Sequence, residues 1–310
     1  MNATALYPTL AFASPRKLPK PKEVSGRVVV LDIAFASEAS GRGFADITRP
    51  FIEQLGPRLV AWVDHHDHVL HAKYKLDPRF MLATKAEHGA CPEMVTPELV
   101  ARIGPVETIV CHNDFDGLCS AAKWIRGGQE PYPGADDDAR AIDTRIGAPS
   151  AIGARFDRAL RARPRDQSLF GIVVRHLATG LSDASLWHCI DEAAEELSAI
   201  EQATRELAAR YTIIPLSGPA PNLAFLEATD HHGRYDKTLL LLLGQARARV
   251  AMVLDRDTLT LAAPFDSGID FLSVLGLSGG MPTLVSVQGE RLREALEKLG
   301  ASRSDIERMI

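Results

Sequence analysis

The chain has 310 residues, which is long for a single hydrophobic core and predicts two domains. Its net charge of −5, from 35 basic and 40 acidic residues, excludes a broad basic surface and argues against tracking long nucleic acid. No apolar run approaches the ~20 residues of a membrane span, and the four cysteines show no zinc-like pairing or disulfide density, so we expect a cytoplasmic protein with no membrane partner.

The N-terminal segment and the first strand differ sharply in composition. Residues 1–25 end in the basic, proline-spaced run RKLPKPKE, which predicts a disordered tail. The run VVVLD at 28–32 is continuous and β-branched, which is typical of a strand buried on both faces of a parallel sheet. This predicted strand ends in Asp32.

A helix over 46–55 and a second buried strand over 59–63 follow. The second strand runs directly into Asp64, His65 and His66. A single acid at such a position often caps a helix or closes a turn, which is the structural alternative to a functional role.

A third buried strand is predicted over 106–111, and it leads into the hexapeptide HNDFDG at 112–117. His112, Asp114 and Asp116 stand on alternate residues, and a glycine then allows a tight turn into a helix over 118–125. The N-terminus of such a helix favours an anion. A weaker fourth strand over 139–142 would end at Asp143.

Up to four predicted strands thus have an aspartate or histidine at the carboxyl end. Open parallel α/β sheets bind ligands outside these ends. Because several such residues together are hard to explain as helix caps, the pattern favours a metal site. Carboxylates and imidazoles suit Mn²⁺ or a similar ion better than zinc, which prefers thiolates.

The second half of the chain changes character. Apolar residues at three- and four-residue spacing from 186 to 207 predict one long amphipathic helix, and we assign 166–211 to a helical connector. Short strands, a hairpin near 249–263 and a final helix predict a smaller α/β substrate-binding domain over 212–310. The catalytic domain is then 26–165, and the fold class is α/β.

The strand-terminal Asp64-His65-His66 triplet, the HNDFDG segment and Asp32 together resemble the DHH phosphoesterase superfamily. That superfamily includes RecJ-type exonucleases, nano-RNases, cyclic-dinucleotide phosphodiesterases and family II inorganic pyrophosphatases. The resemblance covers roughly residues 28–160. The motifs stand in permuted order, because Asp32 and Asp64 precede His112, and this leaves the strand order open.

The resemblance implies a role for each matching residue. Asp32 would bridge two Mn²⁺ ions, for which Mg²⁺ or Co²⁺ are alternatives, and His66 would face the substrate phosphate. Asp32, Asp64 and His66 are the implied catalytic residues. The implied metal ligands are Asp32, His65, His112, Asp114, Asp116 and Asp143.

Three basic residues outside these motifs are candidates for substrate contact. Arg145 follows Asp143 closely and would pair with an acid or with phosphate, whereas Arg234 and Lys237 belong to the second domain. A second triplet, Asp230-His231-His232, has no alternate aspartates nearby and is interpreted mainly as a loop.

These observations favour a two-metal phosphodiesterase acting on short oligonucleotides or small nucleotides. A pyrophosphatase-like phosphoanhydride hydrolase and a non-enzymatic nucleotide sensor are the alternatives. Aromatic residues make up only 6% of the chain, so we expect a small phosphorylated or short nucleotide substrate and no long duplex nucleic acid. The sequence leaves the oligomeric state open, a homodimer included.

Overall fold

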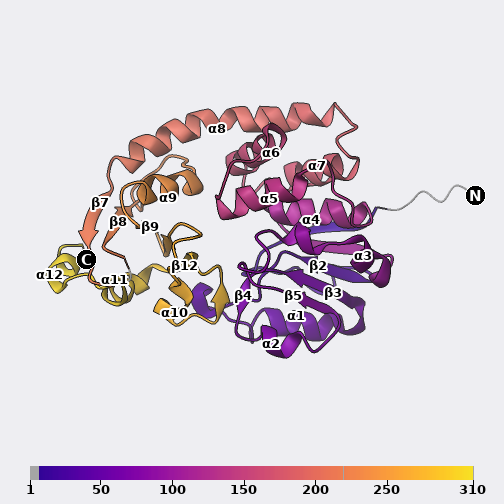
Figure 1. Cartoon of the computed structure of the whole chain (residues 1–310), viewed down its shortest axis with the longest axis horizontal. Coiled ribbons are helices and arrows are strands. Elements are labelled where there is room, and N and C mark those ends of the chain that lie inside the picture. Colours follow the sequence, from indigo (N-terminus) through magenta and orange to yellow (C-terminus); the bar gives the residue numbers. More distant parts are fainter. Residues whose placement is uncertain (1–6, 219, 310) are drawn as a thin grey trace, which may run out of the picture. The chain divides into compact units, whose positions relative to one another are not determined.

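A computed structural model describes residues 7–218 and 220–309 (Figure 1). The chain divides into two compact units. The first unit comprises Met1–Phe35 and Phe44–Glu195, and the second comprises Ala36–Gly43 and Glu196–Ile310. Helix α8 (Leu186–Ala208) begins in the first unit and ends in the second.

The first unit is built on a five-stranded sheet whose paired strands are all parallel. Its strand order is β1-β6-β2-β3-β5. The strands are β1 (Thr9–Ala13), β2 (Val28–Leu31), β3 (Leu59–Asp64), β5 (Phe80–Leu82) and β6 (Thr108–His112). The parallel sheet that the sequence predicts is confirmed, and β2, β3 and β6 occupy three of the predicted positions.

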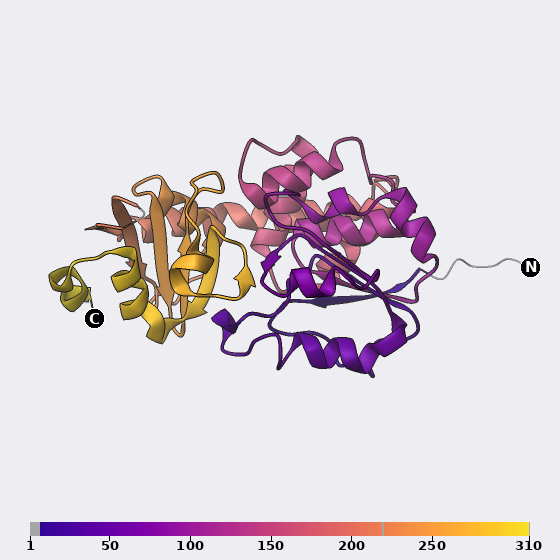
Figure 2. The same cartoon turned by 60° about the horizontal axis from the view of Figure 1, so that its bottom comes forward.

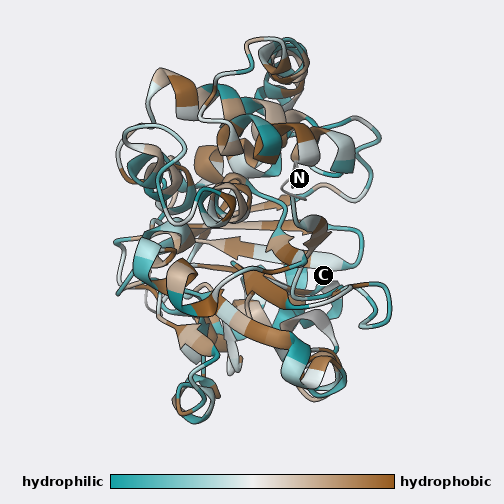
Figure 3. Cartoon of the chain, turned by 90° about the vertical axis from the view of Figure 1, so that its right-hand side faces the viewer, coloured by the Kyte–Doolittle hydropathy of each residue, from teal (hydrophilic) through white to brown (hydrophobic). Residues whose placement is uncertain are grey.

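Helices cover both faces of this sheet (Figures 1 and 2). Val29, Leu31 and Ile109 point into one core with α4 (Phe115–Ile125), α5 (Ala135–Thr144), α6 (Ala151–Ala162) and α7 (Gln167–Ala178). Val28, Val30 and Val110 point into the other core with α1 (Thr48–Leu55). Because successive strand residues face opposite sides, a strand covered on both sides must be apolar throughout. Figure 3 shows these strands mainly in brown, the colour of hydrophobic residues, between the two helical layers.

The strand order contains a switch point between β2 and β6. From β2 the chain continues outward through β3 to β5, and it then returns to β6, on the other side of β2. The helix after β2, α1, packs on one face, and the helix after β6, α4, packs on the opposite face. Such a divergence leaves a crevice at the carboxyl ends of the two strands, where ligands of open α/β sheets bind.

The second unit contains a five-stranded mixed sheet with the order β12-β10-β9-β8-β7, in which only β8 and β9 pair in parallel. Its two faces form separate cores. The strands are β7 (Thr212–Pro215), β8 (Asn222–Glu227), β9 (Val250–Asp255), β10 (Thr258–Ala262) and β12 (Leu284–Gln288). The helices after α8 are α9 (Lys237–Gln245), α10 (Phe271–Leu275), α11 (Leu292–Leu299) and α12 (Arg303–Met309).

Short elements complete the described part of the chain. In the first unit they are η2 (Gly56–Arg58), β4 (Asp67–His68), α2 (His71–Tyr74), η3 (Cys91–Met94) and α3 (Pro97–Ile103). In the second unit they are η1 (Glu38–Ser40), β11 (Gly279–Gly280) and η4 (Gly289–Arg291). Within the described residues, no helix combines the length and apolar character that crossing a membrane requires.

Three predictions from the sequence are wrong. The segment 1–25 is not a disordered tail throughout, because Thr9–Ala13 forms edge strand β1, paired with β6. Residues 139–142 are not a strand but lie in helix α5. The connector does not begin at 166, because α7 packs into the first unit's core through residues such as Leu169 and Val173. Residues 1–6 lie outside the described part of the chain.

Candidate metal centre

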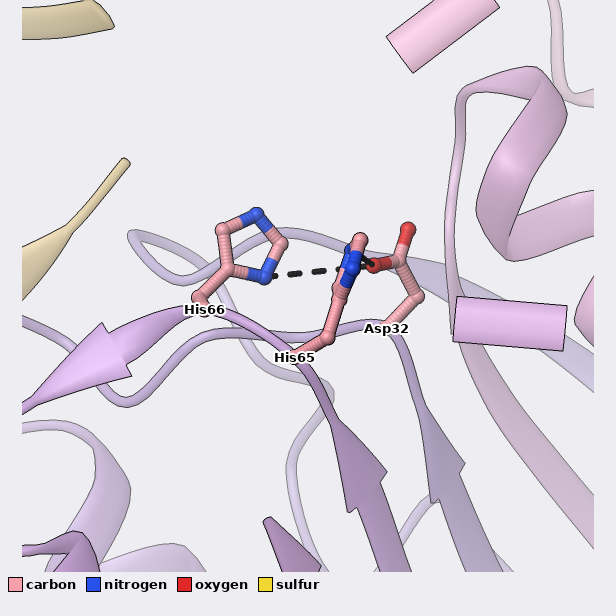
Figure 4. A group of neighbouring side chains, drawn as sticks. All are labelled: Asp32, His65 and His66. Carbon is pink, nitrogen blue, oxygen red and sulfur yellow. Dashed lines mark ion pairs between the residues drawn. The ribbon is translucent and has the colours of Figure 1, made fainter. Parts of the chain in front are cut away.

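The predicted site residues of the first unit gather at the switch point. Figure 4 shows Asp32 and His65 just beyond the carboxyl ends of two neighbouring strands, with His66 beside them. These strands are β2 and β3, which pair in parallel. His112 ends β6, the neighbour of β2 on its other side. Three adjacent strand ends therefore point imidazole and carboxylate groups at one crevice.

Asp32 occupies the centre of this arrangement in a strained conformation. Its φ is +57°, in the left-handed region that aspartate tolerates better than most residues, and its N–H donates to the Val63 carbonyl at 2.9 Å. The residue is 1% exposed, and neither carboxylate oxygen has a hydrogen-bond partner. A buried carboxylate that accepts no hydrogen bond is costly, so this geometry indicates a group that a cation would satisfy.

The two oxygens of Asp32 face different neighbours. Oδ1 lies 3.2 Å from His65 Nε2 and 3.9 Å from His66 Nδ1, and Figure 4 marks both ion pairs. Oδ2 lies 3.7 Å from His112 Nδ1. A carboxylate placed in this way can bind one cation through either oxygen or bridge two.

Among the residues that the structure describes, three groups of side chains have ligand atoms within 4.8 Å of one another, a spacing at which they could share a metal ion. Asp32 belongs to two of them. The groups are Asp32 with His65 and His66, Asp32 with His112 and Asp114, and His65 with Asp116 and Asp143. The six residues predicted as metal ligands all appear among these groups, although their role as ligands stays a prediction.

His65 is oriented by the backbone. Its Nδ1 donates to the His88 carbonyl at 2.9 Å, so Nε2 points toward Asp32 and lies 3.1 Å from Asp116 Oδ2. Asp116 is itself held by the N–H of Cys91, which donates to Oδ1 at 2.9 Å. A backbone hydrogen bond to the distal nitrogen is the usual way in which a metal-binding histidine is fixed in orientation.

Asp114 has a structural role as well. It is the N-cap of α4, and its Oδ1 accepts from Gly117 N at 3.0 Å while His112 Nδ1 donates to Oδ2 at 2.8 Å. Its side chain is 47% exposed. Burial raises its pKa, but the charge of His112 and the Gly117 hydrogen bond outweigh burial and hold the pKa far below its usual range.

Gly117 is required by a close approach of the backbone. A Cβ at this position would lie 2.6 Å from the His112 carbonyl oxygen and 2.9 Å from its carbonyl carbon. Because these are main-chain atoms, Gly117→Ala must push α4 away from β6. We expect a loss of about 1–3 kcal/mol in the free energy of unfolding, typical of overpacking, together with weaker metal binding. Urea unfolding and Mn²⁺ titration measure both, with Gly171→Ala, where a Cβ meets nothing within 4 Å, as the matched control.

His66 is oriented by Asp64. Its Nδ1 donates to Asp64 Oδ1 at 2.8 Å, and its side chain is 19% exposed. Burial, with a further contribution from Lys85, lowers the pKa of His66 to about 4 even though Asp64 opposes the shift. The ring is therefore neutral at pH 7 with a lone pair on Nε2, so His66 does not offer a positive charge to a substrate phosphate.

The carboxylates of the site are crowded. Burial, together with Asp116 and Asp114, raises the pKa of Asp32 well above its usual value. Burial and Asp143 raise the pKa of Asp116 to about 6, although His65 opposes them. Burial lowers the pKa of His112, but Asp114 and Asp32 outweigh it and raise the pKa to about 9. In each case neighbouring carboxylates contribute to raising the pKa, as expected where several acids lie close together and attract cations.

Lys85 is a site residue that the sequence analysis missed. Its ammonium donates to His65 Nε2 at 2.8 Å and to Asp143 Oδ2. Burial lowers its pKa, but Asp143, Asp116 and Asp32 outweigh burial and hold the pKa above its ordinary value. Burial and Lys85 lower the pKa of His65, but Asp116 and Asp32 outweigh them and raise it to about 11. One proton fits between the two nitrogens, and because the pKa of Lys85 is also held above its ordinary value, we assign this proton to the lysine, with His65 as the acceptor. Lys85 lies in a short loop, TKAEH, with no local pattern that marks it.

The remaining predicted residues have other surroundings. Arg145 pairs with Asp157 at 3.3 Å. In the second unit, Arg234 lies 3.9 Å from Glu196, and Lys237 Nζ donates to Ser286 at 3.5 Å. The Asp230-His231-His232 triplet lies in the loop between β8 and α9 and belongs to none of the metal-binding groups found in the described residues. Roles for Arg234 and Lys237 stay predictions.

The donor set fits a divalent ion at the group formed by Asp32, His112 and Asp114. These residues offer hard oxygen donors and an imidazole, and the Asp32 oxygens have no hydrogen bond to lose. The third group differs, because the Lys85 ammonium already lies against His65 and Asp143.

Similarity to known proteins is found among solved structures but not among family models or curated sequences. No protein-family model matches the chain, and no curated protein matches its sequence. The chain is similar to a solved structure described as exonuclease RecJ bound to manganese, with 14% sequence identity and a TM-score of 0.44. The alignment covers 92% of this chain and 76% of that chain.

Proposed function

We propose that the protein is a metal-dependent hydrolase of phosphoester bonds. The observation that supports this most directly is Asp32, a strained, buried carboxylate whose two oxygens accept no hydrogen bond and face separate groups of histidines and aspartates. A fold maintains such an unfavourable group where a cation satisfies it in the working state.

The surroundings favour a phosphate-bearing substrate. The site lies at the switch point of the parallel sheet and at the N-terminus of α4, an 11-residue helix whose first amides attract an anion. A divalent ion bound there would polarise a phosphoryl oxygen and help to ionise the attacking water. We propose Mn²⁺ as the natural ion, because mixed carboxylate and imidazole ligands suit it.

The chain's own residues have distinct roles in this proposal. Asp32, His112 and Asp114 hold the cation. Asp64 fixes the ring of His66 through the Nδ1 hydrogen bond, so that Nε2 accepts a hydrogen bond from the attacking water. Because Nδ1 holds the only N–H proton of the neutral ring, Nε2 can accept a hydrogen bond from water but cannot donate one to a phosphate.

We propose that the substrate is a short oligonucleotide or another small phosphodiester. The chain has a net charge of −5 and few aromatic residues, whereas binding long single strands takes a basic groove with stacking rings. Few phosphates would then be engaged, and binding should depend only weakly on salt.

The test is a comparison of initial rates with Mn²⁺ for bis-p-nitrophenyl phosphate, dinucleotides, cyclic dinucleotides, pyrophosphate and single strands of increasing length at two salt concentrations. We expect dinucleotides to be cleaved faster than strands of about twenty nucleotides. Rates that rise with length and fall steeply in salt would refute the small-substrate proposal. If pyrophosphate were the only compound of this panel to be hydrolysed, the proposed activity would be phosphoanhydride hydrolysis and not phosphodiester cleavage.

A further inference from the structure

The His65, Asp116 and Asp143 group already contains a cation, the ammonium of Lys85. Nζ lies 2.8 Å from His65 Nε2 and forms a hydrogen-bonded ion pair with Asp143. The lysine side chain is 3% exposed, so the charge has no access to bulk water and depends on these partners. Its position is fixed further by the backbone, because Lys85 N donates to Asp67 Oδ2 at 3.3 Å.

An ammonium and a metal ion would compete for the same atoms here. A lysine ammonium is a compact point charge with three donors, so it can satisfy an imidazole lone pair and a carboxylate together. His65 Nε2 can accept from Nζ or bind a metal ion, but not both. Asp116 Oδ2 lies 3.1 Å from that same nitrogen and interacts electrostatically with the positive charge of Lys85.

We propose that the Lys85 ammonium takes the place of a second metal ion, so that the centre binds one divalent ion, at Asp32, His112 and Asp114. This inference rests on the proposed function, since it assumes that the centre binds metal at all. It replaces the two-ion expectation that the sequence suggests. The second positive charge of the centre would then be built into the chain and would not depend on metal supply.

The competing arrangement requires Lys85 to leave its partners. A second ion could enter the group only if the ammonium were displaced, and a side chain so deeply buried would then be charged without a partner. Breaking a buried pair in this way is strongly unfavourable. We therefore expect a second ion to bind at least about a hundredfold more weakly than the first.

The test is the Mn²⁺ stoichiometry of the full chain, measured by equilibrium dialysis with elemental analysis and by electron paramagnetic resonance. The wild-type protein should bind one ion per chain and show the resolved hyperfine pattern of an isolated Mn²⁺ ion. Lys85→Met, which preserves the length of the stem but removes the charge, should bind two ions and give the spectrum of a spin-coupled pair.

Lys123→Met is the matched control. Lys123 is also buried in the first unit, where its ammonium contacts Asp136 and donates to the Pro92 carbonyl at 2.8 Å, away from the site. This variant should keep one ion and the isolated-ion spectrum. If it gained a second ion, loss of any buried lysine would explain the Lys85 result, and the inference would be overturned.

The wild-type measurement decides the matter even if Lys85→Met does not fold. Two ions per wild-type chain with a coupled spectrum would overturn the inference and leave the proposed function standing. No bound Mn²⁺ in the wild-type chain would overturn the proposed function itself. A folded Lys85→Met chain that still binds one ion would show that Lys85 does not exclude the second.

Discussion

Replacing Asp32 by asparagine is expected to abolish metal-dependent turnover, with a loss of about 10³-fold or more in kcat/KM. Asparagine keeps the shape of the side chain and tolerates the left-handed backbone at φ +57°, so the change removes mainly the charge. The charge matters because both oxygens of Asp32 face candidate ligands of the centre. Initial rates and Mn²⁺ affinity, measured on the same preparation, test this.

Asp230→Asn is the control for this variant, because Asp230 belongs to the other acid-and-histidine triplet of the chain. We expect its activity to stay within a few-fold of the wild type. The account would be contradicted if Asp230→Asn were the more damaging change, or if Asp32→Asn kept its metal affinity. Since the buried charge of Asp32 is unfavourable in the metal-free protein, its removal should not lower the melting temperature.

The contribution of Asp32 and Asp116 to the stability of the metal-free protein is expected to fall as the pH rises from 3.8 to about 6. The folded chain holds a proton on Asp116 more tightly than the unfolded chain does, so folding is favoured at the acidic end of this range and loses that contribution as the pH passes about 6. The shift of Asp116 alone corresponds to about 3 kcal/mol. The raised pKa of Asp32 acts in the same direction.

Among the other groups at the site, His66 opposes this trend. Its pKa is lowered from 6.5 to about 4, so its contribution is complete above 6.5 and is lost as the pH falls to about 4. The pKa of His112 is raised to about 9, so its contribution is complete below its ordinary pKa of 6.5 and is lost only as the pH rises through about 9. The pKa values of Asp64 and Asp114 are lowered, so their contributions are lost only as the pH falls below 3.8. The contribution of Asp116 is therefore isolated by comparing the wild type with Asp116→Asn, because His66 is present in both chains.

Metal should remove this trend. A bound cation competes with protons for the same carboxylates, so the stabilisation by Mn²⁺ should grow as the pH rises. Thermal unfolding of metal-free and Mn²⁺-saturated protein across the range from pH 4 to 8 measures both slopes. If the metal-free stability of Asp116→Asn, in which His66 is unchanged, varied with pH between 3.8 and 6 as the wild type does, the carboxylates would not be crowded as described.

Much of the site could be predicted from the sequence because its residues stand next to segments whose secondary structure is easy to predict. Asp32, His65 and His112 each follow a continuous apolar run, and such runs become buried strands of a parallel sheet. Parallel strands place their carboxyl ends at one edge, so the convergence of these residues follows from the strand assignments.

The prediction of a strand over 139–142 was wrong because the secondary structure of this segment is ambiguous in the sequence. The run at 139–142 (ARAI) is short and apolar apart from Arg140, and periodicity alone does not assign such a run to strand or helix. The acids at Asp136–Asp138 and the apolar spacing of Ala135, Ala139 and Ile142 would have indicated a helix start instead. Asp143 nevertheless reaches the site, because α5 packs beside α4 in the same core.

Lys85 could not be predicted, because its role depends on tertiary contacts. Its partners are 20 and 58 residues away in sequence, and a lysine in a short polar loop is ordinarily solvated. The same limit applies to His88, whose backbone carbonyl orients His65 and would do so whatever its side chain.

The most direct test of a metal centre at Asp32 is a crystal structure of the full chain soaked in Mn²⁺, with anomalous scattering recorded at the manganese edge. The account predicts an anomalous peak contacted by Asp32, with His112 and Asp114 as neighbours. A peak at Asp230-His231-His232, or no peak within contact of Asp32 in Mn²⁺-saturated crystals, would contradict it.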